Sequence, residues 1–263
     1  MADISRFLKL TVEDRIATIE FHKPDGNNLL DYGFAEALKQ VLEQAENDSG
    51  VRAVVLTSAH VEYFCAGVDP NYLYQVQQLK VDENIAESAY FAHLFHQIIK
   101  LKKPVVAAVE GAALSEGAVL TNAADFVIAG PQATFGYPDV RFGNIPAVQI
   151  YFALHRLGRG TARRLFLTGE VLNAQSAEQL NIVDEVTKQP GTATERATQF
   201  ARQLARQNAI GSTEFVKKMV ADLPFLPPNE GIAFSAKINA HGRQNSEFLR
   251  GLQARANEDS VEW

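Results

Sequence analysis

The chain has a single cysteine in 263 residues, Cys65, and so lacks the pair of thiols that an internal disulfide requires. Disulfide frameworks belong mainly to secreted domains, whereas a chain without them is typical of a reducing compartment. The sequence also lacks any apolar run of about 18 residues, the length at which a membrane-spanning helix becomes a candidate. Its N-terminal MADISRF does not contain the apolar stretch of a signal peptide. We therefore expect a cytoplasmic protein with no membrane partner.

An excess of positive charge is missing as well. The net charge is -6, and the Lys and Arg residues are scattered along the chain. Because a nucleic-acid-binding face needs clustered basic residues, we expect no nucleic-acid partner. The one arginine-rich stretch is RLGRGTARR at 156–164, which we interpret as an exposed helix start rather than an anion site.

Apolar residues make up 46% of the chain, enough for one sizeable core. Alternating apolar and polar residues over 7–22 predict a β-hairpin. Apolar residues at helical spacing over 34–45 predict a helix, and the apolar segment 51–58 predicts a strand covered on both faces. Strand-like and helix-like segments alternate as far as about residue 186, which predicts an α/β fold with a largely parallel sheet.

The last part of the chain differs from the rest. From about residue 192 onward only helical patterning remains, and the segment 227–263 opens with two prolines and resembles a helical arm. We therefore expect a core over residues 1–195 and a C-terminal helical region over residues 196–263.

Two short segments of small residues each lie between a predicted strand and a helical segment, FCAGVD at 64–69 and GAALSEGAVL at 111–120. The first backbone N–H groups of a helix have no partner within the helix, and the positive end of the helix dipole lies behind them. Two such bends facing one point would offer two donors to a carbonyl oxygen that becomes an enolate. The pair of bends therefore suggests an oxyanion hole.

In this order, these segments and their neighbours resemble the enoyl-CoA hydratase/isomerase (crotonase) superfamily over about residues 10 to 186. The stretches that carry the resemblance are NNLL (27–30), VRAVVLTS (51–58), FCAGVD (64–69), KPVVAAVEGAALSEGAVLTNAADFVIA (103–129), ATFGYPDVRFGNIP (133–146) and LGRGTARRLFLTGEVLNAQSAEQLNIVDEV (157–186). The resemblance implies a crotonase (ClpP-like) spiral of ββα units with the acyl-CoA site in the core. It also implies a C-terminal helical region that makes oligomer contacts, in a homotrimer or a dimer of trimers.

Members of this family bind acyl-CoA thioesters and polarise the thioester carbonyl with two backbone N–H groups. By position, the resemblance assigns these donors to Val68 and Glu116, and it directs the side chain of Glu116 away from the oxygen. Coenzyme A would enter as part of the substrate, and no other cofactor or metal is expected. Further substrate contacts are expected from Ala66, Gly67, Tyr72, Gly117 and Phe142.

The departures from the family pattern concern the catalytic carboxylates. The two glutamates of the hydratases correspond here to Val119 and Asp139, so the first is absent and the second is one methylene shorter. Ala147 stands where dienoyl-CoA isomerases have an aspartate. One carboxylate suits the transfer of a proton, whereas water addition normally needs a second group to hold the water. The expected reaction is therefore enoyl-CoA double-bond isomerisation in fatty acid metabolism, with Asp139 as the proton carrier.

Three alternatives stay open at this point. A hydratase could use Glu116, Tyr72 or water in place of the missing acid, because 116 and 119 are neighbours on a helix face. A decarboxylase or hydrolase could act on a β-keto or carboxylated acyl thioester. A non-catalytic member could bind acyl-CoA without turning it over, with Asp139 as an ordinary turn residue.

Several other residues favour structural interpretations. We interpret Ser115 as an N-cap and Cys65 as a small buried residue, and the side chain of Glu116 as a complement to the helix dipole. His93 and His96 lie three apart on a predicted helix, but without a third ligand they do not predict a metal site.

Overall fold

The structure is a computed structural model that describes residues 4–263. Its core contains two β-sheets, the larger in the order β1-β2-β3-β5-β7-β10 and the smaller in the order β4-β6-β8-β9. The larger sheet comprises β1 (Leu8–Glu13), β2 (Ile16–Phe21), β3 (Ala53–Ser58), β5 (Val105–Val109), β7 (Phe126–Ala129) and β10 (Glu185–Val186). The smaller sheet comprises β4 (Tyr63–Cys65), β6 (Ala112–Leu114), β8 (Thr134–Gly136) and β9 (Val171–Asn173).

One pattern repeats along the chain. A strand of the larger sheet leads directly into a strand of the smaller sheet, and a helical segment follows, as in β3 to β4, β5 to β6 and β7 to β8. Successive strands of each sheet pair in parallel in this part of the chain. The pairs β1–β2 and β8–β9 are antiparallel. The predicted spiral of ββα units and the α/β fold class are therefore confirmed.

The helices alternate with these strands and then continue alone to the C-terminus. The α-helices are α1 (Tyr32–Asn47), α2 (Pro70–Gln77), α3 (Val81–Lys100), α4 (Glu116–Ala123), α5 (Ala147–Thr168), α6 (Ala174–Gln179), α7 (Ala193–Gln207), α8 (Ile210–Asp222), α9 (Pro228–Arg243) and α10 (Ser246–Ala256). Short 3-10 helices are η1 (Ile4–Arg6), η2 (Pro138–Phe142) and η3 (Leu223–Phe225).

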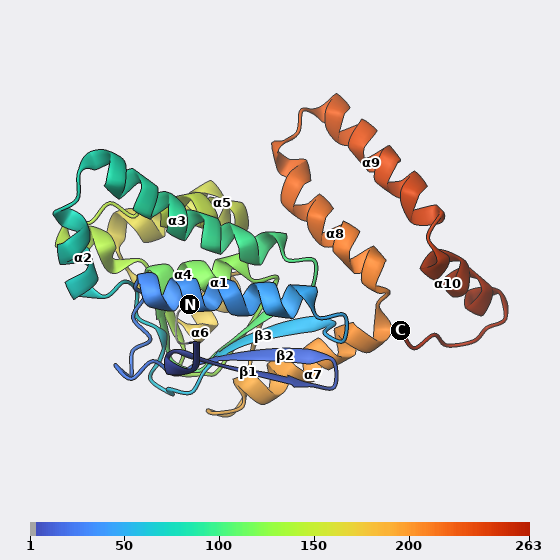
Figure 1. The fold of residues 1–263 in the computed structure, drawn as a ribbon, viewed down its shortest axis with the longest axis horizontal. Helices are drawn as coiled ribbons and strands as arrows, with labels where there is room; N and C mark the ends of the chain where they lie inside the picture. The colour runs from blue at the N-terminus through green and yellow to red at the C-terminus, as the bar shows by residue number, and fades with distance from the viewer. Residues whose placement is uncertain (1–3) are drawn as a thin grey trace.

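The larger sheet is covered on both faces, which explains the unbroken apolar sequence of β3. Val54 and Leu56 join the core cluster that includes α1 and α3, while Ala53 and Val55 pack with α7. Figure 1 shows α1 and α3 on one side of this sheet and α7 on the other. The hairpin over 7–22 and the helix over 34–45 are confirmed as well.

The structure contains strands that the sequence analysis did not predict. β4, β6 and β9 are three residues each, too short to show the two-residue alternation that identifies a strand. The arginine-rich segment 156–164 lies within α5, which bends at Gly158, where φ is +69°. Arg159 and Arg163 are exposed beyond this bend, as expected for the start of an exposed helical segment.

The expected boundary between residues 195 and 196 falls inside α7 rather than between elements. Every fourth residue of α7 is a buried alanine that packs against the larger sheet, so this helix belongs to the core. The four alanines are Ala193, Ala197, Ala201 and Ala205. The helices without buried residues begin only at Ile210, with α8.

The helices α8, α9 and α10 form an arm that extends from the core (Figure 1). Lys217 of α8 anchors the arm, because its ammonium group donates to the carboxylate of Asp125 at 2.7 Å and to the carbonyl oxygens of Ile98 and Lys103 at 3.1 Å. The chain then returns to the core, where the N–H of Trp263 donates to the carbonyl oxygen of Arg206 at 3.0 Å.

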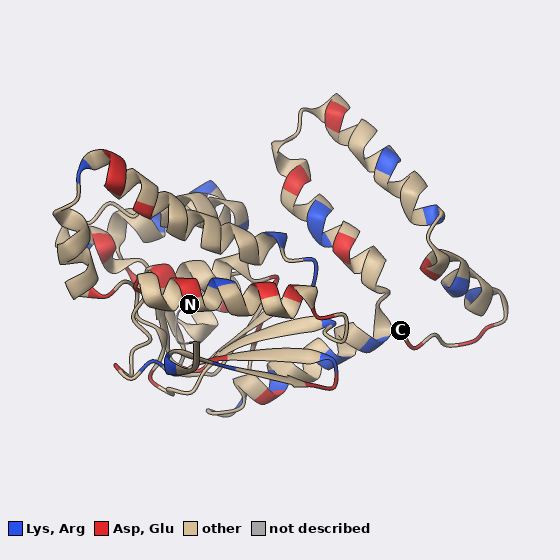
Figure 2. Ribbon diagram, viewed as in Figure 1, with Lys and Arg blue, Asp and Glu red and all other residues tan. Residues whose placement is uncertain are grey.

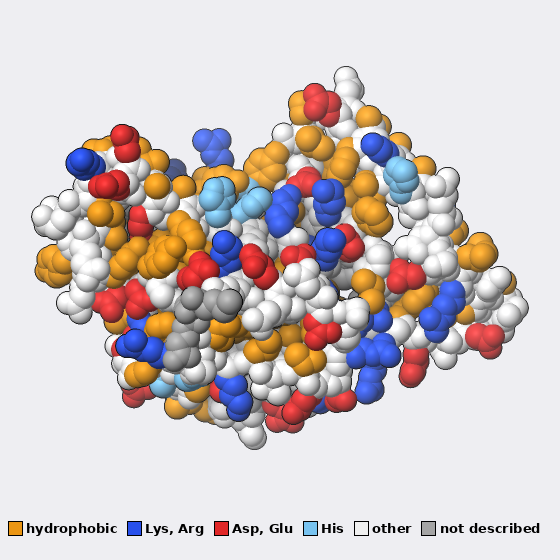
Figure 3. All heavy atoms as spheres, in the orientation of Figure 1, with side chains coloured by type: hydrophobic (Ala, Val, Ile, Leu, Met, Phe, Trp, Pro, Cys, Tyr) orange, Lys and Arg blue, Asp and Glu red, His pale blue; other side chains and the backbone are white. Residues whose placement is uncertain are grey.

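The surface shows no segregation of charge in this view. Lys, Arg, Asp and Glu are distributed over both the core and the arm (Figure 2), in keeping with the scattered charges of the sequence. Hydrophobic side chains are prominent on the arm (Figure 3). Among the helices of residues 4–263, none combines the length and the apolarity that crossing a bilayer requires.

Candidate active site

The loop that carries NNLL lies alongside the first bend and holds it. The N–H of Leu30 donates to the carbonyl oxygen of Gly67 at 2.8 Å, and the N–H of Asp69 donates to the carbonyl oxygen of Leu30 at 2.8 Å. The N–H of Ala66 likewise donates to Asn27 at 3.0 Å. These bonds act as a short parallel ladder and fix the peptide that carries the Val68 N–H.

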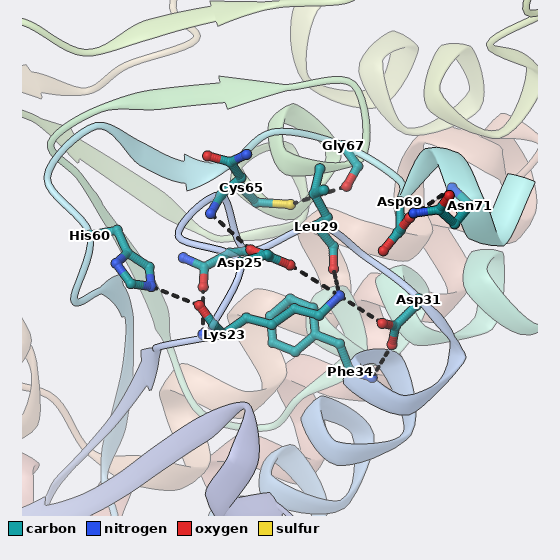
Figure 4. A network of polar contacts seen from close by, with 12 residues as sticks. Lys23, Asp25, Leu29, Asp31, Phe34, His60, Cys65, Gly67, Asp69 and Asn71 are labelled. Carbon is teal, nitrogen blue, oxygen red and sulfur yellow. Dashed lines mark hydrogen bonds and ion pairs between the residues drawn. The ribbon is translucent and has the colours of Figure 1, made fainter.

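Lys23 holds this loop from within, and the sequence analysis did not identify it. Its buried ammonium group donates to the carbonyl oxygen of Leu29 and to the carboxylate of Asp31, both at 2.6 Å, and lies 3.2 Å from a carboxylate oxygen of Asp25. Figure 4 shows these three groups converging on the lysine nitrogen. Nothing in the sequence marks Lys23 as buried, because its partners come from a loop without periodicity.

Two glycines allow the second bend to approach the first. A Cβ atom on Gly117 would lie 2.0 Å from the carbonyl oxygen of Cys65, so only glycine fits between β4 and the start of α4. Gly67 has φ +104°, a conformation that favours glycine, and a Cβ there would lie 3.1 Å from that of Ser115. The two bends are therefore in direct contact.

The backbone N–H groups of Val68 and Glu116, the expected donors, lie near one acceptor, the carboxyl group of Glu116. Both amides act on this carboxyl group to lower its pKa, and its Oε2 lies 3.5 Å from where a Cβ atom on Gly67 would be. The two amides therefore face one small volume, which is the arrangement that an oxyanion hole requires.

The acceptor is unexpected, because the resemblance directs the Glu116 side chain away from the hole. Instead this side chain folds back over the N-terminus of its own helix, where Nε2 of Gln149 donates to its Oε1 at 2.6 Å. Burial, and then the nearby charge of Asp139, raise the pKa of the Glu116 carboxyl to about 8. The sequence analysis interpreted the Glu116 side chain as a complement to the helix dipole, and the carboxyl group does lie at the N-terminus of α4. It also lies within the candidate site, beside Asp139.

Asp139 lies beside this carboxyl group, in η2, and is only 2% exposed. Its Oδ2 accepts a hydrogen bond from the Ser115 hydroxyl at 2.7 Å, and its Oδ1 accepts one from Nδ2 of Asn144 at 3.0 Å. Ser115 occupies the N-cap position of α4, but its side chain makes no capping hydrogen bond, so that interpretation was wrong about the hydroxyl. The hydroxyl orients Asp139 instead.

The other expected contact residues are spread around this centre. Burial, and then the nearby charge of Glu87, raise the pKa of the Tyr72 hydroxyl, and the Tyr72 ring packs against that of Phe91 with centroids 6.0 Å apart. Tyr72 also lines a cavity of about 550 Å³ with Lys23 and Asn71, beside the first bend. Phe142 lies at the end of η2 and is 66% exposed.

Val119 and Cys65 are buried within the core near the bends. Burial raises the pKa of the Cys65 thiol to about 12, so this residue is the small buried side chain that was predicted. His93 and His96 are both exposed on α3. No set of three His, Cys, Asp or Glu side chains that could hold a metal ion occurs in residues 4–263.

A spiral of ββα units in which two such bends meet is the architecture of the crotonase fold, a family of enzymes that act on acyl-CoA. The chain belongs to the enoyl-CoA hydratase/isomerase family, whose sequence profile matches residues 11–263.

Individual relatives agree with this family. The chain is similar to a Thermus thermophilus protein provisionally named an enoyl-CoA hydratase, at 34% identity over 91% of this chain and 93% of that protein. It is 30% identical to a short-chain-enoyl-CoA hydratase of Clostridium acetobutylicum over 80% of this chain and 79% of that protein. Among solved structures, an enoyl-CoA hydratase from Shewanella pealeana superposes with a TM-score of 0.90 at 26% identity, covering 98% of this chain and 96% of that one.

Proposed function

We propose that the protein is an enoyl-CoA isomerase that shifts a double bond between the 3,4 and 2,3 positions of an acyl-CoA. The N–H groups of Val68 and Glu116 would bind the thioester oxygen, and Asp139 would carry the proton. The observation that supports this reaction is the placement of Asp139, whose two oxygens are held by Ser115 and Asn144 next to the paired amides.

The proposed reaction consists of two proton transfers. The Asp139 carboxylate takes a proton from C2 of a 3-enoyl thioester, and the electron pair moves through the carbonyl to give a dienolate with its charge on oxygen. The protonated Asp139 then returns the proton to C4, which leaves the double bond between C2 and C3. Each amide of the hole contributes roughly 3–4 kcal/mol of transition-state stabilisation. The positioned base contributes about 10²- to 10⁴-fold in rate.

The substrate would need no cofactor beyond its own coenzyme A. We place the start of the pantetheine chain at the cavity beside Tyr72, Lys23 and Asn71, which adjoins the first bend. Ala66, Gly67 and Gly117 would contact the thioester through their backbones, because they belong to the two bends that carry the amides. Phe142 is a candidate contact for the acyl chain.

Hydration of a 2-enoyl-CoA is the second candidate. The relatives from Clostridium acetobutylicum and Shewanella pealeana carry the name enoyl-CoA hydratase. The carboxyl group of Glu116 also lies near enough to Asp139 for the charge of Asp139 to raise its pKa. Glu116 could therefore supply the second acid that position 119 lacks.

Direct assays separate the two candidates. We expect the purified protein to convert a 3-enoyl-CoA into the 2-enoyl-CoA, and Asp139→Asn to lose at least about 100-fold in kcat. Asp14→Asn, a change at an exposed ion pair with Arg202, is the matched control and should keep full activity. Accumulation of a 3-hydroxyacyl-CoA from the 2-enoyl-CoA, without isomerisation, would instead assign the hydratase reaction.

The arm is proposed to mediate assembly into a homotrimer or a dimer of trimers. Three helices without buried residues expose large apolar side chains, among them Val220, Ile232 and Leu252 at 71%, 70% and 52%. Contact with other copies would remove this surface from water. Analytical ultracentrifugation should show wild-type protein as a trimer or hexamer. The double variant Ile232→Asp, Leu252→Asp should sediment as a monomer.

A further inference from the structure

The oxyanion hole of this protein already has an acceptor from its own chain. The carboxyl group of Glu116 lies near the N–H groups of Val68 and of Glu116 itself, the two donors proposed for the thioester oxygen, and both amides favour its charged form. Oε2 of Glu116 also lies 3.5 Å from where a Cβ atom on Gly67 would be, so the carboxyl group fills the space against the first bend.

A second residue holds the carboxyl group in this position. Gln149, from the first turn of α5, is buried, and its Nε2 donates to Oε1 of Glu116 at 2.6 Å. The Glu116 carboxyl group therefore lies between the first bend and the start of α5, and accepts a hydrogen bond from the α5 side.

A carbonyl oxygen and a carboxyl oxygen cannot both take the two amide donors, since each N–H directs one hydrogen bond along its axis. We infer that the carboxyl group of Glu116 is an internal occupant of the oxyanion hole, held by Gln149, which the thioester carbonyl must displace in order to bind. This inference rests on the proposed function, because it assumes that the thioester uses the amides of residues 68 and 116.

The charge on the occupant decides how easily it leaves. The ionisable groups that face it are Asp139 from η2 and Glu87 from α3, whose charges favour its neutral form, together with Cys65 from β4 and Tyr137 beside β8. The amide donors favour the carboxylate. With a pKa of about 8, Glu116 is mostly neutral at pH 7 and mostly ionised at pH 9.

A carboxylate accepts stronger hydrogen bonds than a neutral acid, so displacement is harder above pH 8 than below it. Wild-type protein should therefore bind a thioester more weakly at pH 9 than at pH 7. Losing charged hydrogen bonds to a competitor corresponds to roughly tenfold in affinity.

Titration calorimetry with butyryl-CoA, a saturated thioester with no double bond to move, tests the inference at pH 7 and pH 9. Glu116→Ala should bind butyryl-CoA about tenfold more tightly than wild type at pH 9 and show little dependence on pH. Gln149→Ala, which frees the occupant without removing it, should bind with intermediate affinity. Free coenzyme A, which has no thioester carbonyl, is the control ligand and should bind wild type and Glu116→Ala equally.

If Glu116→Ala disturbs the fold, Glu116→Gln provides the same test, because a neutral amide of the same shape should remove the pH dependence of butyryl-CoA binding. Equal butyryl-CoA affinities for wild type and both Glu116 variants at pH 9 would overturn the inference while leaving the proposed function intact. Weaker binding by Glu116→Ala would also overturn it and make Glu116 a substrate ligand. No difference between butyryl-CoA and coenzyme A in any variant would refute the proposed function itself.

Discussion

At the scale of single residues, two carboxyl groups in one site are held in different ways. Asp139 accepts hydrogen bonds on both oxygens from neutral side chains, whereas Glu116 accepts one such bond, from Gln149 to its Oε1. The family resemblance, rather than local sequence pattern, led us to expect Asp139 and the amides of Val68 and Glu116 in the site. Neither predicted the orientation of Glu116, because its rotamer depends on Gln149, which lies 33 positions further along the chain.

The raised pKa of Glu116 makes the stability of the fold depend on pH. Its pKa is about 8 when folded, above the ordinary value of 4.5, so the folded state binds a proton more tightly than the unfolded state. This stabilisation is complete below pH 4.5 and is lost as pH rises towards 8, by about 1.4 kcal/mol per pH unit at the steepest. Urea denaturation should show the stability of wild type falling relative to Glu116→Gln over this range. A constant difference between the two proteins would contradict the assigned burial.

Lys23 should matter for both stability and binding. Lys23→Met leaves the carboxylate of Asp31 without its cation and releases the carbonyl oxygen of Leu29. Breaking one partner of a largely buried ion pair costs about 3 kcal/mol, which urea denaturation would measure. Lys9→Met, a change on the exposed part of β1, is the control and should have little effect. Stability of Lys23→Met equal to that of the control would show that the loop is held by its backbone bonds alone.

At the scale of elements, the site depends on how closely α4 approaches β4. The sequence analysis identified both bends by their small residues, and the long strands by their apolar character. It did not identify β4, β6 or β9, because a strand of three residues is too short to show the alternation of apolar and polar residues. The pairing of these strands is set by contacts between segments that are distant in the sequence. The family resemblance, rather than local pattern, led to the ββα spiral.

Gly117 tests this close approach. Gly117→Ala would place a methyl group 2.0 Å from the carbonyl oxygen of Cys65, so α4 and β4 must separate. We expect a loss of about 1–3 kcal/mol of stability from overpacking, together with weaker thioester binding because the two amides move apart. Gly160→Ala, at a helical position where an added Cβ meets nothing within 4 Å, should instead stabilise by about 0.5–1 kcal/mol. Equal effects of the two changes on thermal unfolding would refute this account of the contact.

At the scale of the whole molecule, the arm is attached to the core by few contacts. Helices α9 and α10 bury no residue, and the ammonium group of Lys217 on α8 forms the main buried polar link. The sequence predicted a helical region here but placed its start within α7. Helical spacing alone does not distinguish the alanines that pack on the sheet from those of an exposed helix.

Lys217 therefore offers a way to release the arm. Lys217→Met leaves Asp125 without its cation and should raise the hydrogen exchange of α8 and its sensitivity to protease, with a loss of about 3 kcal/mol in stability. Lys218→Met is the matched control, because that lysine is more than half exposed and only 3.8 Å from Asp222 across one turn. Similar exchange rates for α8 in both variants would mean that apolar contacts hold the arm.

The central claim is that the amides of residues 68 and 116 share one thioester oxygen. It is tested most directly by infrared difference spectroscopy of an unsaturated acyl-CoA labelled with ¹³C at the thioester carbonyl and bound to Asp139→Asn, which should not turn it over. Two converging donors should polarise the C=O bond and shift its stretching band to lower frequency than in water. A band at the solution frequency would contradict the claim.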